Sequence, residues 1–198
     1  MASIWTQYIG SMILRQQTTH PYKPAKLSKF EVMTWEEPEI GCWTQTLRQI
    51  IEKSKQERMQ ATVPKDVATR FKNLDTYKSW ASTGILFFAL TDYSGDVGGL
   101  IWFERKQNPV VPKAETTFAI RMYDGYEGKG LAKPFMSVAH FMLPKLMDVS
   151  PNVWLETDVG NDPARGLYNS FGYNEIGITD AGRVLMAYYR QDGSQNNE

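Results

Sequence analysis

The sequence of 198 residues has little cysteine, little histidine and no excess charge of either sign. The single cysteine, Cys42, excludes an internal disulfide and a thiol-rich metal site. The histidines His20 and His140 are far apart, so we expect no zinc site built from them. Lys and Arg total 22, as do Asp and Glu, which leaves no basic surplus to hold a phosphate backbone. We therefore expect no metal and no nucleic-acid partner.

Long apolar runs are also absent. No stretch of about 20 apolar residues is present, so no membrane-spanning helix and no membrane partner are expected. The partly apolar start of the chain is followed by its first basic residue, Arg15, which is the reverse of the order in a secretory signal. Together with the low cysteine content, these features predict a cytoplasmic protein.

What is present is typical of a globular domain, with 42% apolar and 22% charged residues. A loop-rich extension at 1–26 and a polar tail at 191–198 flank the domain expected over 27–190. Periodicity predicts strands near 29–35, 84–90, 100–103, 116–123, 153–157 and 184–189, and helices near 41–56, 67–77, 131–144 and 163–170. This interleaving predicts an α/β (α+β) fold with a mixed central sheet flanked by helices.

A glycine-rich turn lies between the strand predicted at 116–123 and the helix predicted at 131–144. Its glycines Gly125, Gly128 and Gly130 let the backbone turn sharply and approach a ligand closely. The start of the helix adds unpaired N–H groups and the positive end of the helix dipole, which together bind phosphate or pyrophosphate. A plain strand-to-helix turn that needs glycine is the alternative.

Three phosphate-binding patterns compete for this turn. Gly125 and Gly130 have the spacing of a P-loop, but the Lys and Ser or Thr that should follow are missing. A dinucleotide fingerprint fails because Lys133 stands where its third glycine belongs. The acetyltransferase pattern Arg/Gln-x-x-Gly-x-Gly/Ala is matched at Gly130 and Ala132 but departs at Glu127. That carboxylate must point away from any bound pyrophosphate, or be offset by nearby lysines.

A second motif follows after one helix and one strand. The residues on the pattern Asn-x-x-Ala-x-x-Leu-Tyr, followed by a Gly-aromatic pair, are Asn161, Ala164, Leu167, Tyr168, Gly172 and Tyr173. Asn161 or Asp162 can cap a helix, and the positions three and four apart share one helix face. With the glycine turn, this motif resembles the GNAT-type N-acetyltransferase family over residues 84–190.

The resemblance implies a splayed central sheet, in which two parallel strands, 116–123 and 153–157, part to admit the arm of acetyl-CoA. It also implies a set of cofactor-binding residues on those strands, the turn and the following helix. These are Phe118, Ala119, Ile120, Glu127, Gly128, Lys129, Gly130, Leu131, Ala132, Asn161 and Tyr168. No metal is implied.

The family's chemistry is direct attack of an amine on the thioester, with an N–H donor near Ile120 or Arg121 for the oxyanion. Tyr168 would protonate the departing thiolate, and core packing is the alternative role for its ring. Glu156 is the first candidate base, ahead of Glu104 and Asp158, although each is also an ordinary surface charge.

The acceptor is expected to be a small-molecule or protein amine, and the resemblance allows a homodimer. The rival function is a non-catalytic acyl-CoA-binding regulatory module of the same fold. His140 is expected to be structural. The aromatic residues of the first half, such as Trp80 and Trp102, are expected either in the core or along an acceptor pocket.

Overall fold

The computed structural model describes residues 29–33, 42–83, 85–92 and 94–190, so the expected extension at 1–26 and tail at 191–198 lie outside it. The elements in chain order are β1 (Lys29–Met33), α1 (Cys42–Ser54), α2 (Glu57–Thr62), the π-helix η1 (Asp66–Arg70), α3 (Leu74–Ala81), β2 (Ile85–Thr91), β3 (Val97–Arg105), β4 (Thr116–Met122), α4 (Ala132–Leu146), β5 (Val153–Asp158), α5 (Asp162–Phe171), β6 (Asn174–Ile178) and β7 (Arg183–Tyr188). Within the described ranges, no helix is both long enough and apolar enough to cross a membrane.

The strands form one seven-stranded sheet in the order β1-β2-β3-β4-β5-β7-β6. Strands β1 to β4 are antiparallel neighbours, and so are β5, β7 and β6. The pair β4 and β5 is parallel and joins the two antiparallel halves. The predicted mixed sheet flanked by helices is therefore confirmed.

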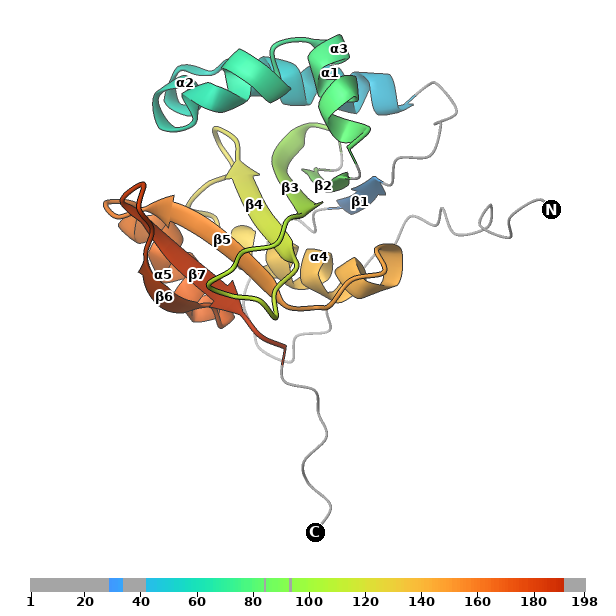
Figure 1. The fold of residues 1–198 in the computed structure, drawn as a ribbon. Coiled ribbons are helices and arrows are strands. Elements are labelled where there is room, and N and C mark those ends of the chain that lie inside the picture. The colour runs from blue at the N-terminus through green and yellow to red at the C-terminus, as the bar shows by residue number, and fades with distance from the viewer. Residues whose placement is uncertain (1–28, 34–41, 84, 93, 191–198) are drawn as a thin grey trace, which may run out of the picture.

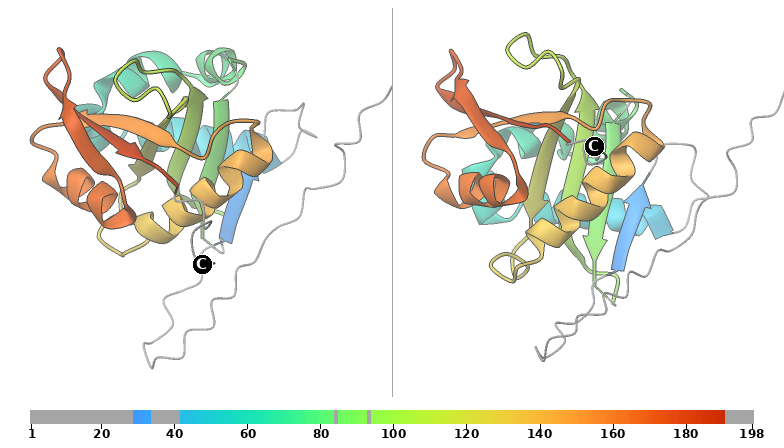
Figure 2. Two further views of the ribbon diagram at one scale, coloured as in Figure 1. Left: turned by 60° about the horizontal axis from the view of Figure 1, so that its bottom comes forward. Right: turned by 90° about the horizontal axis from the view of Figure 1, so that it is seen from below.

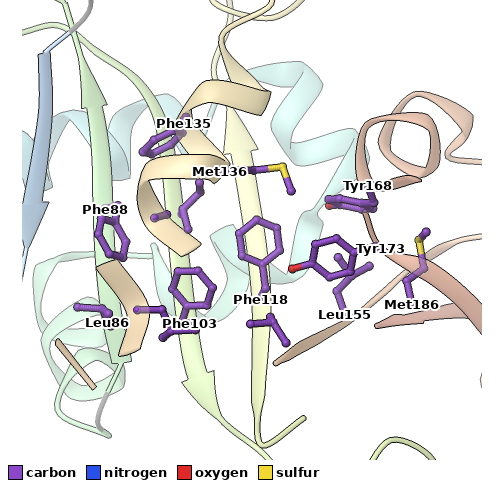
Figure 3. Close-up of a cluster of buried hydrophobic side chains, with 14 of the residues drawn as sticks. Leu86, Phe88, Phe103, Phe118, Phe135, Met136, Leu155, Tyr168, Tyr173 and Met186 are labelled. Carbon is purple, nitrogen blue, oxygen red and sulfur yellow. The ribbon is translucent and has the colours of Figure 1, made fainter. Parts of the chain in front are cut away.

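Helices cover both faces of the sheet, as Figures 1 and 2 show: α1 to α3 on one face, and α4 and α5 on the other. Strand side chains alternate between the faces, so each strand contributes to two cores. Phe88, Phe103 and Phe118 pack on the face of α4, where Figure 3 shows them. Phe87 and Trp102 pack on the face of α1 to α3.

The segment before β2 differs from the sequence prediction, which expected one helix near 67–77. The chain instead forms η1 and then α3, because Asn73 starts a new helix. The Asn73 side chain accepts a hydrogen bond from the Thr76 N–H at 2.9 Å, and the Thr76 hydroxyl accepts one from the Asn73 N–H at 3.1 Å. This reciprocal capping box fixes the break between the two helices.

Strand β6 was not predicted from the sequence, and the reason lies in its exposure. All of its residues are exposed, so the alternation of apolar and polar residues that marks a half-buried strand is missing.

The sequence also predicts that Pro144 ends or kinks the helix expected at 131–144. Helix α4 instead runs on to Leu146, with Pro144 inside its last turn.

Candidate functional site

The sheet opens at its centre, between β4 and β5. These strands pair in parallel over Thr116–Thr117 and Val153–Trp154, and the described structure has no later pair between them. Beyond this point β4 continues to Met122 and β5 to Asp158, and Figure 1 shows the two strands diverging. The predicted splayed pair is therefore present.

The backbone of β4 presents hydrogen-bonding groups to this opening. The Tyr123 N–H donates to the Gly98 carbonyl of β3 at 2.9 Å, which fixes the direction of alternate residues in the antiparallel pair. By this alternation Ala119 faces its β3 partner, whereas Phe118, Ile120 and Met122 turn their backbone groups toward β5. A chain-like ligand between the strands would thus meet amide and carbonyl groups spaced as in a sheet edge.

Two of these edge carbonyls are already partnered by arginine side chains. The Arg121 guanidinium donates to the Ile120 carbonyl at 2.9 Å. The Arg58 guanidinium, from α2, donates to the Met122 carbonyl at 2.8 Å. Both arginines therefore lie at the rim of the opening, although neither belongs to a motif recognised in the sequence.

The glycine turn follows β4 directly. Gly125, Gly128 and Gly130 have φ angles of 84°, 69° and 71°, in the left-handed region that other residues rarely adopt. The turn leads into α4, whose N-cap Leu131 makes no side-chain capping hydrogen bond and whose first turn carries no acidic residue. The first N–H groups of α4 therefore have no side-chain cap and suit an anion such as a phosphate.

Glu127, the residue that departs from the acetyltransferase pattern, is held by other groups of the protein. Its carboxylate lies 3.0 Å from the Arg58 guanidinium and accepts a hydrogen bond from the Tyr126 N–H at 3.1 Å. Arg58 also pairs with Asp124 at 2.8 Å. Glu127 thus has a cationic partner, and one arginine, shared by two carboxylates of the turn, ties them to the end of β4.

Tyr126 ties the same turn to the β2–β3 connection. Its hydroxyl donates to Asp92 at 2.8 Å and to Asp96 at 3.0 Å, and burial together with these carboxylates raises the pKa of Tyr126. A side chain at Gly98 would strike the Tyr126 ring, since a Cβ there would lie 2.3 Å from it. The glycine at position 98 is therefore what lets the ring pack directly against β3.

Two lysines, one in the turn and one at the start of α4, make different contacts. Lys129 lies 5.5 Å from the centre of the Tyr126 ring, in a cation–π position on the exposed side of the turn. Lys133 reaches the other way and donates to the Ser170 carbonyl at the end of α5. Lys129 is the one that stays beside the glycines.

Tyr168 of α5 lies in the core beside β4. Its ring packs edge-on against Phe118 with centroids 6.2 Å apart, and the side chain is 8% exposed. Figure 3 shows it beside Tyr173 and Met136. Burial raises the pKa of Tyr168, against the opposing charges of Arg121 and Arg183. The phenol is therefore protonated at neutral pH, and its hydroxyl makes no hydrogen bond with other described residues.

Glu156 lies on the opposite face of β5 from the Leu155 side chain that packs near Tyr168. Its carboxylate is 3.6 Å from the Arg183 guanidinium, which also pairs with Asp158 at 2.9 Å. The three residues form a half-exposed charged cluster at the far edge of the opening. The structure does not bring Glu156 and Tyr168 into contact.

Asn161 caps α5 through its side-chain oxygen, which accepts a hydrogen bond from the Ala164 N–H at 3.3 Å. The residue is exposed, and Pro163 occupies the first turn behind it. Gly172, at φ 115°, ends the helix in the left-handed conformation. The motif thus builds a short, well-capped helix that carries Tyr168 on its buried side.

His140 is neutral and structural. Its Nδ1–H donates to the Met136 carbonyl at 2.9 Å, which leaves Nε2 to accept a hydrogen bond from the Tyr173 hydroxyl at 2.7 Å. Burial lowers the pKa of His140 to about 4. The described residues include no group of three or more His, Cys, Asp or Glu side chains placed to hold a metal ion.

A wide, open groove of about 520 Å³ lies on the face of α1 to α3. Its lining residues come from η1, from α3 and the residues just after it, and from the end of β3: Thr69, Arg70, Thr76, Ser79, Trp80, Thr83 and Glu104. Beneath it, the buried carboxylate of Asp66 binds Arg70 at 3.0 Å and Arg121 at 2.7 Å. Arg121 thereby connects the groove to the opening in the sheet.

Comparison with known proteins adds to this geometry. No protein-family model and no curated protein matches the chain. A solved structure of spermidine N-acetyltransferase from Vibrio cholerae, in complex with CoA and spermine, matches with a TM-score of 0.61 at 17% identity, over 80% of this chain and 94% of that one. AAC(6')-Ib in complex with acetyl-CoA matches with a TM-score of 0.59 at 13% identity, over 81% and 92% of the two chains. A putative phosphinothricin N-acetyltransferase matches at 0.55 and 16% identity, over 82% and 99%.

The chain has the GNAT-type N-acetyltransferase fold. Within this fold, Phe118 and Ile120 lie at the opening, the turn lies at its wide end, and Tyr168 lies beside β4. The two local motifs in the sequence pointed to the turn and to Tyr168, and the GNAT resemblance added Phe118 and Ile120 by implication. It missed Arg58, Asp66 and Arg70, which approach from helices far away in the sequence and carry no local signal.

Proposed function

We propose that the chain is an N-acetyltransferase that moves the acetyl group of acetyl-CoA to a primary amine. One observation carries the proposal: the opening between β4 and β5 runs directly into a turn with three left-handed glycines and a helix start with no side-chain cap. A cofactor whose long thioester arm leads to a pyrophosphate has the shape and charge for this sequence of features.

The residues present suit the arm and the pyrophosphate of the cofactor. The backbone groups of Phe118 and Ile120 would hold the amides of the arm, with Ala119 between them facing β3. The N–H groups over 128–132 would hold the pyrophosphate, and Lys129 adds positive charge beside it. Arg58 pairs with the Glu127 carboxylate, which reduces the repulsion between this carboxylate and the phosphates. Asn161 stands at the start of α5 for a further contact with the arm.

Acetyl-CoA supplies an activated carbonyl, and direct attack by the amine nitrogen breaks the bond between carbonyl carbon and sulfur. The Tyr168 hydroxyl is the acid that would give its proton to the departing sulfur, since it is protonated and has no competing hydrogen bond in the described structure. Glu156 is our first candidate to receive the proton lost by the amine. Its position on the other face of β5 means that a water must carry the proton to it.

The direct test is thiol release from acetyl-CoA in the presence of a panel of primary amines. We expect amine-dependent release, with Tyr168→Phe lowering kcat at least tenfold while the Kd for acetyl-CoA stays within about twofold. The matched control is Tyr189→Phe, at an exposed tyrosine outside the site, which should leave both values unchanged. Binding of acetyl-CoA without turnover across the panel would indicate a non-catalytic acyl-CoA-binding module, and unchanged turnover in Tyr168→Phe would remove this tyrosine from the acid role.

A further inference from the structure

The groove between η1, α3 and β3 contains one side chain of each charge among its lining residues, Arg70 and Glu104. The rest of its lining is polar or aromatic, chiefly threonine and serine hydroxyls and the ring of Trp80. We infer that this groove binds the acceptor, and that the acceptor is an amine that also carries a carboxylate, as an amino acid does. The inference rests on the proposed function and names its substrate class.

Arg70 is held in place to bind an anion. One nitrogen of its guanidinium donates to the buried Asp66 at 3.0 Å. Its planar group also lies 5.1 Å from the ring centre of Trp80 and 5.6 Å from that of Trp102. The two ring contacts and the ion pair restrain the guanidinium, which lines the groove and belongs to a side chain that is 33% exposed. A preorganised guanidinium of this kind favours a carboxylate with two acceptor oxygens.

Asp66 does not cancel the positive charge around it. The same buried carboxylate also binds Arg121 at 2.7 Å, so a single negative charge faces two guanidinium groups. The cluster therefore carries a net positive charge beside the groove, which an anionic group of a ligand can neutralise. A ligand with positive charge at both ends would be repelled at this end.

Glu104 supplies the negative charge of the groove. It is partly buried at the end of β3 and makes no ion pair with any described residue. Opposite it in the sheet is Thr117, and Thr117 is the last residue of β4 to pair with β5. Glu104 thus stands where the two strands part, and its carboxylate can hold an ammonium group there, next to the opening that would receive the thioester.

The experiment measures kcat/KM by thiol release for matched pairs of acceptors that differ only in the carboxylate, such as phenylalanine against phenethylamine and lysine against cadaverine. We expect at least tenfold preference for the member with the carboxylate in one or more pairs. Arg70→Gln should raise the KM for the preferred acceptor at least tenfold and leave the KM for acetyl-CoA unchanged. Arg48→Gln, at an exposed position of α1, is the matched control and should alter neither value.

Glu104→Gln provides a second variant that leaves Asp66 and its ion pairs intact. It should weaken the binding of every amine in the panel, with or without a carboxylate. Equal use of both members of every pair, or an equal effect of Arg70→Gln on both members, overturns the inference.

Direct binding separates failure of this inference from failure of the proposed function. Thermal shift with the amino acids alone needs neither acetyl-CoA nor turnover. Saturable stabilisation that is lost in Arg70→Gln supports the groove even when no acetyl transfer occurs, and so would place the fault in the proposed function. Acetyl transfer to amines without any dependence on Arg70 supports the proposed function and removes the groove from it. With neither binding nor transfer, both fail.

Discussion

Replacing Arg58 by methionine tests how the protein accommodates a glutamate in its cofactor turn. The substitution removes the hydrogen bond to the Met122 carbonyl and the ion pairs with Asp124 and Glu127. It keeps much of the apolar stem of the side chain. We expect weaker binding of acetyl-CoA, because the turn loses its link to α2 and the Glu127 carboxylate loses its partner.

The contacts set the size of the effect. The two ion pairs join groups that are 42 to 45% exposed, so after screening by solvent each contributes roughly 0.5 kcal/mol. A charge-assisted hydrogen bond to a backbone carbonyl contributes about 1.5 kcal/mol. If the two ion pairs and the hydrogen bond all serve to order the turn for binding, removing them costs about 2.5 kcal/mol of binding free energy. This loss raises the Kd for acetyl-CoA by at most roughly 60-fold.

Calorimetric titration of acetyl-CoA into the wild type, Arg58→Met and the double variant Arg58→Met/Glu127→Gln measures the effect. The double variant should bind more tightly than Arg58→Met alone, because it no longer holds an uncompensated carboxylate near the pyrophosphate. The Arg48→Met variant is the matched control. A Kd for Arg58→Met within twofold of the wild type, or no recovery in the double variant, would refute the role assigned to Arg58.

Gly98→Ala should displace the Tyr126 ring and lower the free energy of unfolding by about 1–3 kcal/mol, while Gly177→Ala, which has open space around it, should cost less than about 1 kcal/mol in urea unfolding. Asp66→Asn should cost about 3 kcal/mol in the same assay, because it leaves two guanidinium groups sharing no carboxylate; a loss under 1 kcal/mol would contradict this. His140 has a pKa of about 4 in the folded protein, whereas in the unfolded chain it takes up a proton near pH 6.5. Because the unfolded state therefore binds more protons between these pH values, His140 should lower the free energy of unfolding by about 3 kcal/mol as the pH falls from 6.5 to 4. His140→Phe should show a shallower slope over that range, and an identical slope would mean that other groups cause it.

Much of the fold after residue 84 could be predicted from the sequence, because its strands and helices are half-buried and show the matching periodicity. The positions of β4, α4, β5 and α5 agree with the predicted ranges to within a few residues. Strand β6 could not be found this way, since an exposed edge strand has no apolar side to reveal it. The division of 57–81 into short helices depends on the Asn73 capping box, whose sequence signal is weak beside a continuous helical spacing.

The candidate site shows the same limit at the level of single residues. Gly130 and Tyr168 belong to local motifs, and each motif is a strand or turn with its following helix. By contrast, the fate of the Glu127 charge depends on Arg58, which precedes it by a large part of the chain and appears in the sequence only as part of a charged helix end. Likewise, the shared use of Asp66 by Arg70 and Arg121 requires η1 to lie against β4, which no local pattern predicts.

Hydrogen exchange with and without acetyl-CoA tests the central claim most directly, because it reports on individual backbone segments. We predict slower exchange at two segments on adding acetyl-CoA: residues 118–122 of β4 and residues 126–132 of the turn and the start of α4. Helix α1, on the other face of the sheet, should be unaffected. Binding of acetyl-CoA without protection of these two segments, or no binding at all, would contradict the proposal that the opening between β4 and β5 is the cofactor site.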